Sequence, residues 1–417
     1  MSDTFWGWMT VLGRFISSFV YMGTSKAFGV LIPHLVDQLD STEGTIGLCG
    51  SLFAGLPHVA GPVTTALVNR YGVRNVIMFG GTITFIGLLS AALSTNEVHL
   101  GISLALAGYA NGFCIIACIM PLTWYFPDNF PLVNSISASG GALGMMLLPP
   151  ITEKFIKLYG WRGTIALLAA LSSHSVMSGA IVKEPKHAKY DSITAIDEES
   201  SSLIPRNTRP FTDKLKECLR FIDASIFQIY PLFIDFQLLF LIFGTALAAW
   251  VLFLIPNSMA KGVPSNVAAF LSTIGGVGHV IGRLAQGPLI NMGLIADTQL
   301  FGVLSLLGAI CFLADLWLFK YIPLAVSAFI VGFATGAQYT LSLSMTKRLV
   351  TRKDLLLPAM GWTHLFIGIG KIIGGPLVGY LMDATGEYTA SFFTLGGLEI
   401  VSIILVLQLE IKTRFVK

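Results

Sequence analysis

Four basic residues stand inside long apolar runs of this sequence: Arg14, Lys26, Arg283 and Lys371. A cation that faces hydrocarbon costs a few kcal/mol or more, so each must face a cavity, a partner or the membrane interface. A guanidinium holds a carboxylate through two parallel charge-assisted hydrogen bonds and stays charged at any physiological pH. A lysine ammonium can follow an anion on its flexible stem. These residue types, set against few embedded acids, predict the recognition of a small organic anion.

Ionisable residues near Arg283 and Lys371 give these two cations alternative roles, as partners of an ion pair or of a proton-transfer group. His279 lies four residues before Arg283 and shares its helical face, where it can contact a substrate, pass a proton or be satisfied locally. Asp315 is the alternative ion-pair partner of Arg283. Lys371 either adds positive charge to a pocket or pairs with Glu399, and we favour the pairing.

Polar residues in other apolar runs are further candidates for a binding pocket. Asn134 can hydrogen-bond a hydroxyl or a carboxylate oxygen, and helix packing is an equally good interpretation. Gln338 and Tyr339 follow a run of small residues and can line a pocket or pack in a core. Lys26 has its own alternative, because a lysine near the end of a span can snorkel to the outer interface.

The sequence carries no motif for nucleotide or metal chemistry. A P-loop would need a Gly-rich turn that ends in Gly-Lys-Ser/Thr, and no such turn is present. Metal-ligand clusters with recognisable spacing are also absent from the sequence. We therefore expect neither a cofactor nor a metal, and no enzymatic or ATP-driven activity.

The elements that must position these residues are membrane helices. Hydrophobic residues make up 54% of the 417 residues and charged residues only 12%, about half the charge of a soluble domain. Runs long enough to cross a bilayer as helices, about 20 residues each, recur along nearly the whole chain. We count twelve, at 6–31, 45–68, 75–93, 99–125, 132–152, 163–182, 236–254, 266–290, 298–318, 322–346, 356–382 and 389–409. The predicted fold class is an all-α membrane protein.

One long polar segment divides the spans six and six. The predicted units are residues 1–182, a linker at 183–235 and residues 236–417. Lys and Arg concentrate in this linker and in the other segments on its side of the membrane, which places both termini in the cytoplasm. The first span lacks a basic n-region and reads as a helix rather than a cleavable signal. An acidic dileucine-like pattern starts at Glu199, although a plain linker is the simpler interpretation.

Three segments resemble signatures of one transporter family. They are Trp6-Gly7-Trp8 with Lys26, then Tyr125-Phe126 with Asn134, and Phe270-Leu271-Ser272 leading to Arg283. Their order and spacing resemble helices one, five and eight of the monocarboxylate transporter family, a branch of the major facilitator superfamily. The resemblance implies the major facilitator fold, with twelve transmembrane helices in two six-helix bundles that rock about a central cavity.

The resemblance also implies a function. Lys26, Asn134 and Arg283 match family residues that face the substrate, and Tyr339 joins them as a pocket candidate. The chain is expected to move a monocarboxylate or related solute by alternating access, in the plasma membrane or, given the dileucine-like pattern, in endosomal or lysosomal membranes. A single-span accessory glycoprotein, as in family relatives, is an implied partner; no nucleic acid is expected.

Coupling to protons stays open at this point. Proton-coupled members of the family carry an Asp one turn before the helix-eight Arg, whereas this chain carries His279. Either His279 takes over the proton, or the chain is a proton-independent carrier of amino acids, creatine or hormone-like solutes. A nutrient sensor that binds without transporting is a third, less favoured reading.

Overall fold

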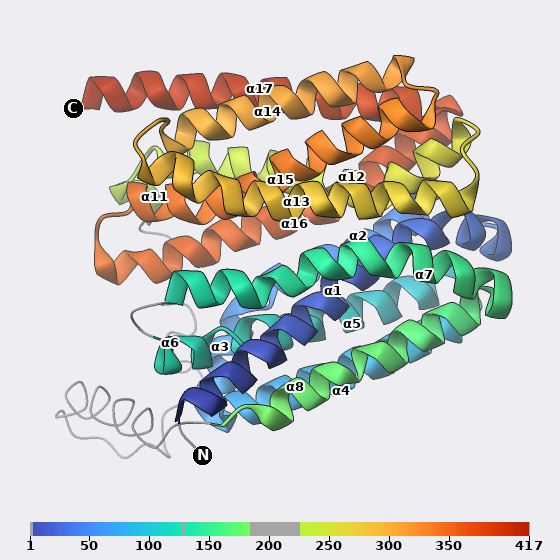
Figure 1. The fold of residues 1–417 in the computed structure, drawn as a ribbon, viewed down its shortest axis with the longest axis horizontal. Helices are drawn as coiled ribbons and strands as arrows, with labels where there is room; N and C mark the ends of the chain where they lie inside the picture. The colour runs from blue at the N-terminus through green and yellow to red at the C-terminus, as the bar shows by residue number, and fades with distance from the viewer. Residues whose placement is uncertain (1–2, 127–129, 184–225, 417) are drawn as a thin grey trace.

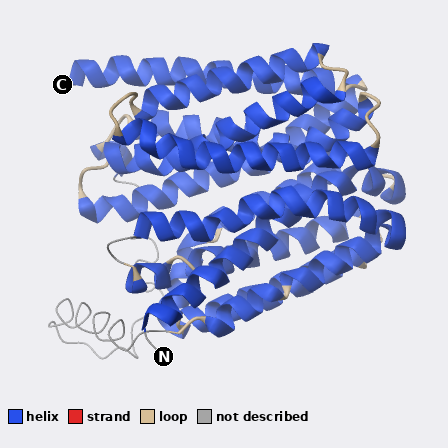
Figure 2. Cartoon of the chain, in the orientation of Figure 1, coloured by secondary structure: helices blue, strands red, loops and turns tan. Residues whose placement is uncertain are grey.

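The computed structural model describes residues 3–126, 130–183 and 226–416. Within these ranges the chain is almost wholly helical and contains no strand (Figure 2). This follows from the apolar composition, because only a helix satisfies every backbone polar group within its own segment in a bilayer. The all-α membrane class predicted from the sequence is confirmed.

The first part of the chain forms eight described helices. They are α1 (Asp3–Leu39), α2 (Glu43–Val59), α3 (Gly61–Tyr71), α4 (Val73–Ala92), α5 (Glu97–Ala117), α6 (Met120–Tyr125), α7 (Phe130–Ser172) and α8 (His174–Ile181).

The second part begins with a short helix and continues with six long ones. They are α11 (Ile226–Ile229), α12 (Phe233–Ala260), α13 (Ser265–Asn291), α14 (Asp297–Ala314), α15 (Tyr321–Leu349), α16 (Lys353–Thr385) and α17 (Tyr388–Val416), with a 3₁₀ turn, η1 (Asp315–Trp317), after α14.

Ten helices of the described residues are long and apolar enough to cross a membrane. The predicted span 132–152 lies within the long helix α7, which is broken at Gly160 by a left-handed φ of 67°, and the span 163–182 is divided between the end of α7 and α8. The span predicted at 45–68 is divided between α2, of 17 residues, and α3. The chain is therefore a multi-pass membrane protein, and the count of twelve spans remains a prediction.

The helices gather in two groups, α1 to α8 and α11 to α17, drawn in blue to green and in yellow to red in Figure 1. The groups, here called the first and second halves, meet where α1 packs on α12, α2 on α16 and α7 on α13. Both termini lie at one end of the bundle, which we call the terminal end; the opposite end is the far end. The predicted linker lies mostly outside the described residues, so the domain bounds remain a prediction.

Glycines let α2 and α16 approach closely. A Cβ atom on Gly375 would lie 2.2 Å from the carbonyl oxygen of Gly47, and one on Gly55 would lie 2.7 Å from that of Gly368. The Ser51 hydroxyl adds a polar contact, since it accepts a hydrogen bond of 2.9 Å from the backbone N–H of Gly375. Small residues of this kind are what close helix packing in lipid requires.

The far end of the molecule is closed by polar contacts between the halves. Asp383 of α16 accepts hydrogen bonds from the N–H groups of Glu43 and Gly44, at 2.9 and 2.8 Å, and so caps the positive end of α2. Tyr388 of α17 donates a hydrogen bond to the Glu43 carboxylate.

A second far-end contact joins α7 and α13. Ser265 of α13 donates a hydrogen bond of 2.6 Å to Glu153 of α7, whose carboxylate also pairs with Lys157 at 3.0 Å. Because α2 and α7 belong to one half and α13, α16 and α17 to the other, these bonds must break for the far end to open.

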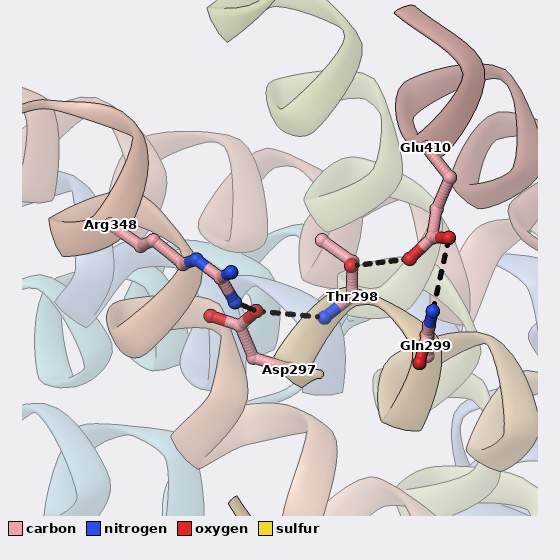
Figure 3. A network of polar contacts seen from close by, with 5 residues as sticks. All are labelled: Asp297, Thr298, Gln299, Arg348 and Glu410. Carbon is pink, nitrogen blue, oxygen red and sulfur yellow. Dashed lines mark hydrogen bonds and ion pairs between the residues drawn. The ribbon is translucent and has the colours of Figure 1, made fainter. Parts of the chain in front are cut away.

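At the terminal end a polar network ties helices of the second half to one another (Figure 3). Arg348 of α15 pairs with Asp297 of α14 at 2.6 Å, and Glu410 of α17 accepts hydrogen bonds from Thr298 and Gln299. The network lies within one half, so it supports movement of that half as a rigid body.

Candidate functional site

The four cations that the sequence places in apolar runs lie along the interior of the bundle. Arg14, Lys26 and Lys371 are 7%, 0% and 4% exposed, and Arg283 is half-buried. Among the residues that the structure describes, none of the four has an Asp or Glu within ion-pair distance. The interior therefore carries an excess of positive charge without acidic counter-charges.

Tyr339 of α15 brings two of these cations together. The guanidinium of Arg283 on α13 lies 4.8 Å from the centre of the Tyr339 ring, and the ammonium of Lys371 on α16 lies 5.9 Å from it. An aromatic face attracts both cations, so the ring holds them near each other despite their mutual repulsion. The Nε of Arg283 has no hydrogen-bond partner among the described residues, which leaves donor capacity for a ligand.

Asn134 of α7 joins this group through Arg14, the cation for which the sequence indicated no partner. Its side-chain oxygen accepts a hydrogen bond from Arg14 of α1. The charges of Arg14 and Arg283 act on each other, so the two guanidinium groups belong to one electrostatic environment. The only sequence signal for Arg14 was its position, a cation in the middle of an apolar run.

Lys26 is bound to the opposite half of the molecule. Its ammonium on α1 donates a hydrogen bond of 3.1 Å to the backbone carbonyl of Trp250 on α12 and lies 3.7 Å from the centre of the Trp250 ring. Lys26 is fully buried here, so it does not snorkel to an interface as one interpretation of the sequence suggested. In this conformation it joins the two halves.

His279 is deeply buried and has no hydrogen-bond partner on either ring nitrogen among the described residues. It stands one turn before Arg283 on α13, as the spacing predicted, and the charges of Arg283, Lys371 and Lys26 act on it. An unpartnered imidazole among cations is placed to accept or donate a hydrogen bond to a ligand.

The two acids considered as ion-pair partners, Asp315 for Arg283 and Glu399 for Lys371, lie elsewhere. Asp315 at the end of α14 pairs with Lys261 at 2.6 Å and accepts hydrogen bonds from Asn257, so it is neutralised near the far end and does not meet Arg283. The pairing of Lys371 with Glu399 that the sequence favoured is not formed.

Lys371 and Glu399 do not pair because their side chains point toward different neighbouring helices. Lys371 on α16 faces α2 of the other half, where it contacts His58. Glu399 on α17 faces α14, where it is hydrogen-bonded to Ser305. Gln338 also donates to Ser305, at 3.0 Å, so it is buried within the second half rather than in a pocket.

Sequence reasoning missed two histidines at the contact of α2 and α16. His58 Nε2 lies 3.3 Å from Nζ of Lys371, and the rings of His58 and His364 are stacked with centres 6.1 Å apart. Each is an isolated ionisable residue in an apolar run, the same signal that identified the cations.

A small cavity between the halves reaches this region. Its lining residues come from α1, α2, α7, α12 and α16: Tyr21, Met22, Ser25, Ala54, Met145, Leu247, Ala248, Val251 and Lys371. A larger hollow, lined by Leu316, Thr385 and Phe393 among others, lies on the surface of the far end, away from the cations. Of these two, the central cavity is the one that includes an interior cation, Lys371. Among the described residues no cluster of His, Cys, Asp and Glu is arranged to hold a metal ion.

Comparison with known families and sequences gives a consistent result. Residues 14–314 match the model of the Major Facilitator Superfamily. The chain is 27% identical to monocarboxylate transporter 13 of Bos taurus over 94% of its length and 87% of that protein. It is 26% identical to monocarboxylate transporter 2 of Rattus norvegicus, over 94% and 81% of the two chains.

Solved structures show the same fold at low sequence identity. A nucleoside transporter aligns with a TM-score of 0.74 at 14% identity, over 96% of this chain and 99% of that one. A peptide transporter of the POT type, in complex with sulfate, aligns with a TM-score of 0.73 at 16% identity, over 97% and 94%.

Proposed function

This chain belongs to the major facilitator superfamily and is a secondary transporter of small solutes rather than an enzyme, and we propose that its cargo is a monocarboxylate or a related carboxylate-bearing solute. One observation carries the proposal: four interior cations lack acidic partners among the described residues, and Arg283 keeps a donor free. A carboxylate supplies the missing negative charge. The names of the similar proteins, monocarboxylate transporters 13 and 2, support the same class of cargo.

In the proposed binding mode, Arg283 holds the carboxylate through its planar fork. Tyr339 fixes the guanidinium from one side, and Lys371 adds a second positive charge near the same ring. Asn134, oriented by Arg14, offers its side-chain NH₂ to a carboxylate or hydroxyl oxygen.

Transport requires the two ends of the bundle to open in turn, one while the other is closed. In this structure the far end is held shut by the bonds of Glu43 and Glu153 to the second half. We propose that cargo reaches the cations from the terminal end, and that rocking of the halves then breaks the far-end bonds and opens the opposite path. Lys26, bound to Trp250 across the two halves, is the group that exchanges this contact for the cargo during the movement.

Proton-independent, facilitative passage is the second candidate, and His279 favours it. The position one turn before Arg283 holds an imidazole with no partner among the described residues, rather than a carboxylate that must be protonated for release. Under this alternative the cargo extends to amino acids, creatine and hormone-like solutes. Uptake measured with and without an imposed pH gradient separates the two, because symport responds to the gradient.

We also propose the plasma membrane, with both termini in the cytoplasm, as the site of action. The concentration of Lys and Arg in segments on the terminal side supports this orientation. The resemblance to monocarboxylate transporters supports a single-span accessory glycoprotein as a partner. Co-purification of a single-span glycoprotein with the chain from surface membranes is the corresponding measurement.

Counterflow of radiolabelled carboxylates in proteoliposomes tests the cargo proposal. The variant Arg283→Lys keeps the charge but loses the fork, so we expect it to lose most transport. Arg162→Lys is the matched control, because Arg162 contacts only residues of the first half among those described, the Ser94 carbonyl and the Trp161 ring. Full transport of carboxylates by Arg283→Lys and Arg283→Ala would refute the binding role.

A further inference from the structure

His58 and Lys371 form a contact between two basic groups across the two halves of the molecule. Nε2 of His58 on α2 lies 3.3 Å from Nζ of Lys371 on α16, and both side chains are buried, at 9% and 4% exposure. Two donors cannot share one hydrogen bond, so a nitrogen lone pair must face the ammonium. The contact therefore holds at most one positive charge, and when Lys371 is charged it donates to a neutral His58.

The described residues around His58 offer no acidic group that would offset a charge on it in this conformation, and only the backbone of Gly55 favours the charged form. Its other ring nitrogen, Nδ1, has no hydrogen-bond partner among the described residues. The facing ring of His364 has its Nδ1 2.9 Å from the Met360 carbonyl, which places the hydrogen on that nitrogen and leaves Nε2 as an acceptor. Tyr21 of α1 lies 6.4 Å away, measured between ring centres, and its hydroxyl is bound to the Ala54 carbonyl.

Among the described residues, the charged groups that act on this contact from other helices are basic. Arg283 of α13 acts on Lys371, and Arg14 of α1 acts on His364. His279 of α13 also lies in the field of Lys371, and Tyr339 of α15 presents its ring to the ammonium. A second positive charge at the contact would therefore be repelled by Lys371 itself and by the cations of two further helices, α1 and α13.

We propose that the His58–Lys371 contact is a proton-binding site that is closed while the halves meet and accepts one proton when α2 and α16 separate. On separation the lone pair of His58 Nε2 is released from the ammonium, and a proton from water binds to it. Lys371 keeps its own three hydrogens. The reverse movement expels the proton before the contact forms again.

The direction of the effect follows from linkage. A ligand that binds one of two states better shifts the population toward that state, and here the ligand is a proton and the favoured state is the separated one. Acid therefore opens the far end. Because one proton is involved, the ratio of separated to closed molecules changes by at most about tenfold per pH unit. The effect rests on a helix contact and requires no cargo, so it does not depend on the proposed substrate.

Electron–electron distance measurement between two spin labels tests this inference on the full chain in lipid nanodiscs, without substrate. Labels at Gln38 and Ala384, both exposed near the far end and on opposite halves, report its opening in a background free of native cysteines. We expect the long-distance fraction to rise as the pH falls from about 8 to about 5, the range in which imidazoles titrate.

Three variants make the test specific. His58→Gln keeps an acceptor for Lys371 but cannot become charged, so its distance distribution should not change with pH. Lys371→Met removes the nearest competing charge while His58 stays buried near the other cations, so the pH dependence should be clearly weaker than in the parent chain. His99→Gln is the matched control, because His99 contacts Ser90 within the first half, and it should respond as the parent chain does. A parent chain that ignores pH, or an undiminished response in His58→Gln, would overturn the proposal.

Discussion

The guanidinium of Arg283 lies 4.8 Å from the centre of the Tyr339 ring, and the two residues come from different helices, α13 and α15, of the same half. The arrangement holds the guanidinium against an aromatic ring. Nε of Arg283 has no hydrogen-bond partner among the described residues. Because the ring attracts the cation without forming a hydrogen bond to Nε, this donor stays available to a carboxylate.

Replacement of the Tyr339 ring should weaken binding in proportion to the lost ring–cation attraction. That attraction contributes about 0.5 to 2 kcal/mol, so Tyr339→Leu should raise the KM for a carboxylate by about twofold to thirtyfold. Tyr339→Phe keeps the ring and should stay within about twofold of the parent value. Initial uptake rates over a range of substrate concentrations measure both. Equal KM values for the Leu and Phe variants would show that the ring does not support Arg283.

Removal of the Lys26 ammonium should abolish transport without lowering the thermal stability of the protein. Lys26 is fully buried against Trp250 and has no acidic partner among the described residues, so its charge carries a desolvation cost that an apolar residue of similar volume avoids. We therefore expect Lys26→Met to keep or raise the Tm in detergent while it abolishes counterflow. A lowered Tm together with full transport would contradict the role of Lys26 as a contact that is exchanged during the cycle.

Asp383 should control how often the far end opens. Its carboxylate caps the N-terminus of α2 across the two halves, a contact of roughly 0.5 to 2 kcal/mol. Asp383→Ala should therefore raise the ratio of open to closed far ends by about twofold to thirtyfold. The spin-label pair at Gln38 and Ala384 measures this ratio. Thr385→Ala, which loses hydrogen bonds only at the end of α16, is the control and should leave the ratio unchanged.

Close packing of α2 on α16 should depend on Gly375. A Cβ atom there would lie 2.2 Å from the Gly47 carbonyl oxygen, so Gly375→Ala must push the helices apart. We expect a marked loss of transport and a population shifted away from the closed far end. Gly361→Ala in the same helix meets no atom within 4 Å and should behave as the parent chain. If both variants transport equally well, the glycine contact is not needed for closure.

The amino-acid sequence by itself determined that this chain is an all-helical membrane protein with cations in its interior. Apolar runs of bilayer length can satisfy their backbone only as helices, and a cation in such a run must avoid lipid. Both conclusions follow from local composition, without knowledge of which helices meet. The position of Arg14, Lys26, Arg283 and Lys371 inside the bundle could be predicted for this reason.

The partners of these cations were decided by the tertiary structure alone. Lys371 meets His58 rather than Glu399, and Arg14 meets Asn134, because close glycine contacts set the register and the facing sides of the packed helices. Sequence spacing fixes which residues share a face of one helix, as for His279 and Arg283. It does not fix which face turns toward which neighbour, since that depends on how all the helices pack together at once.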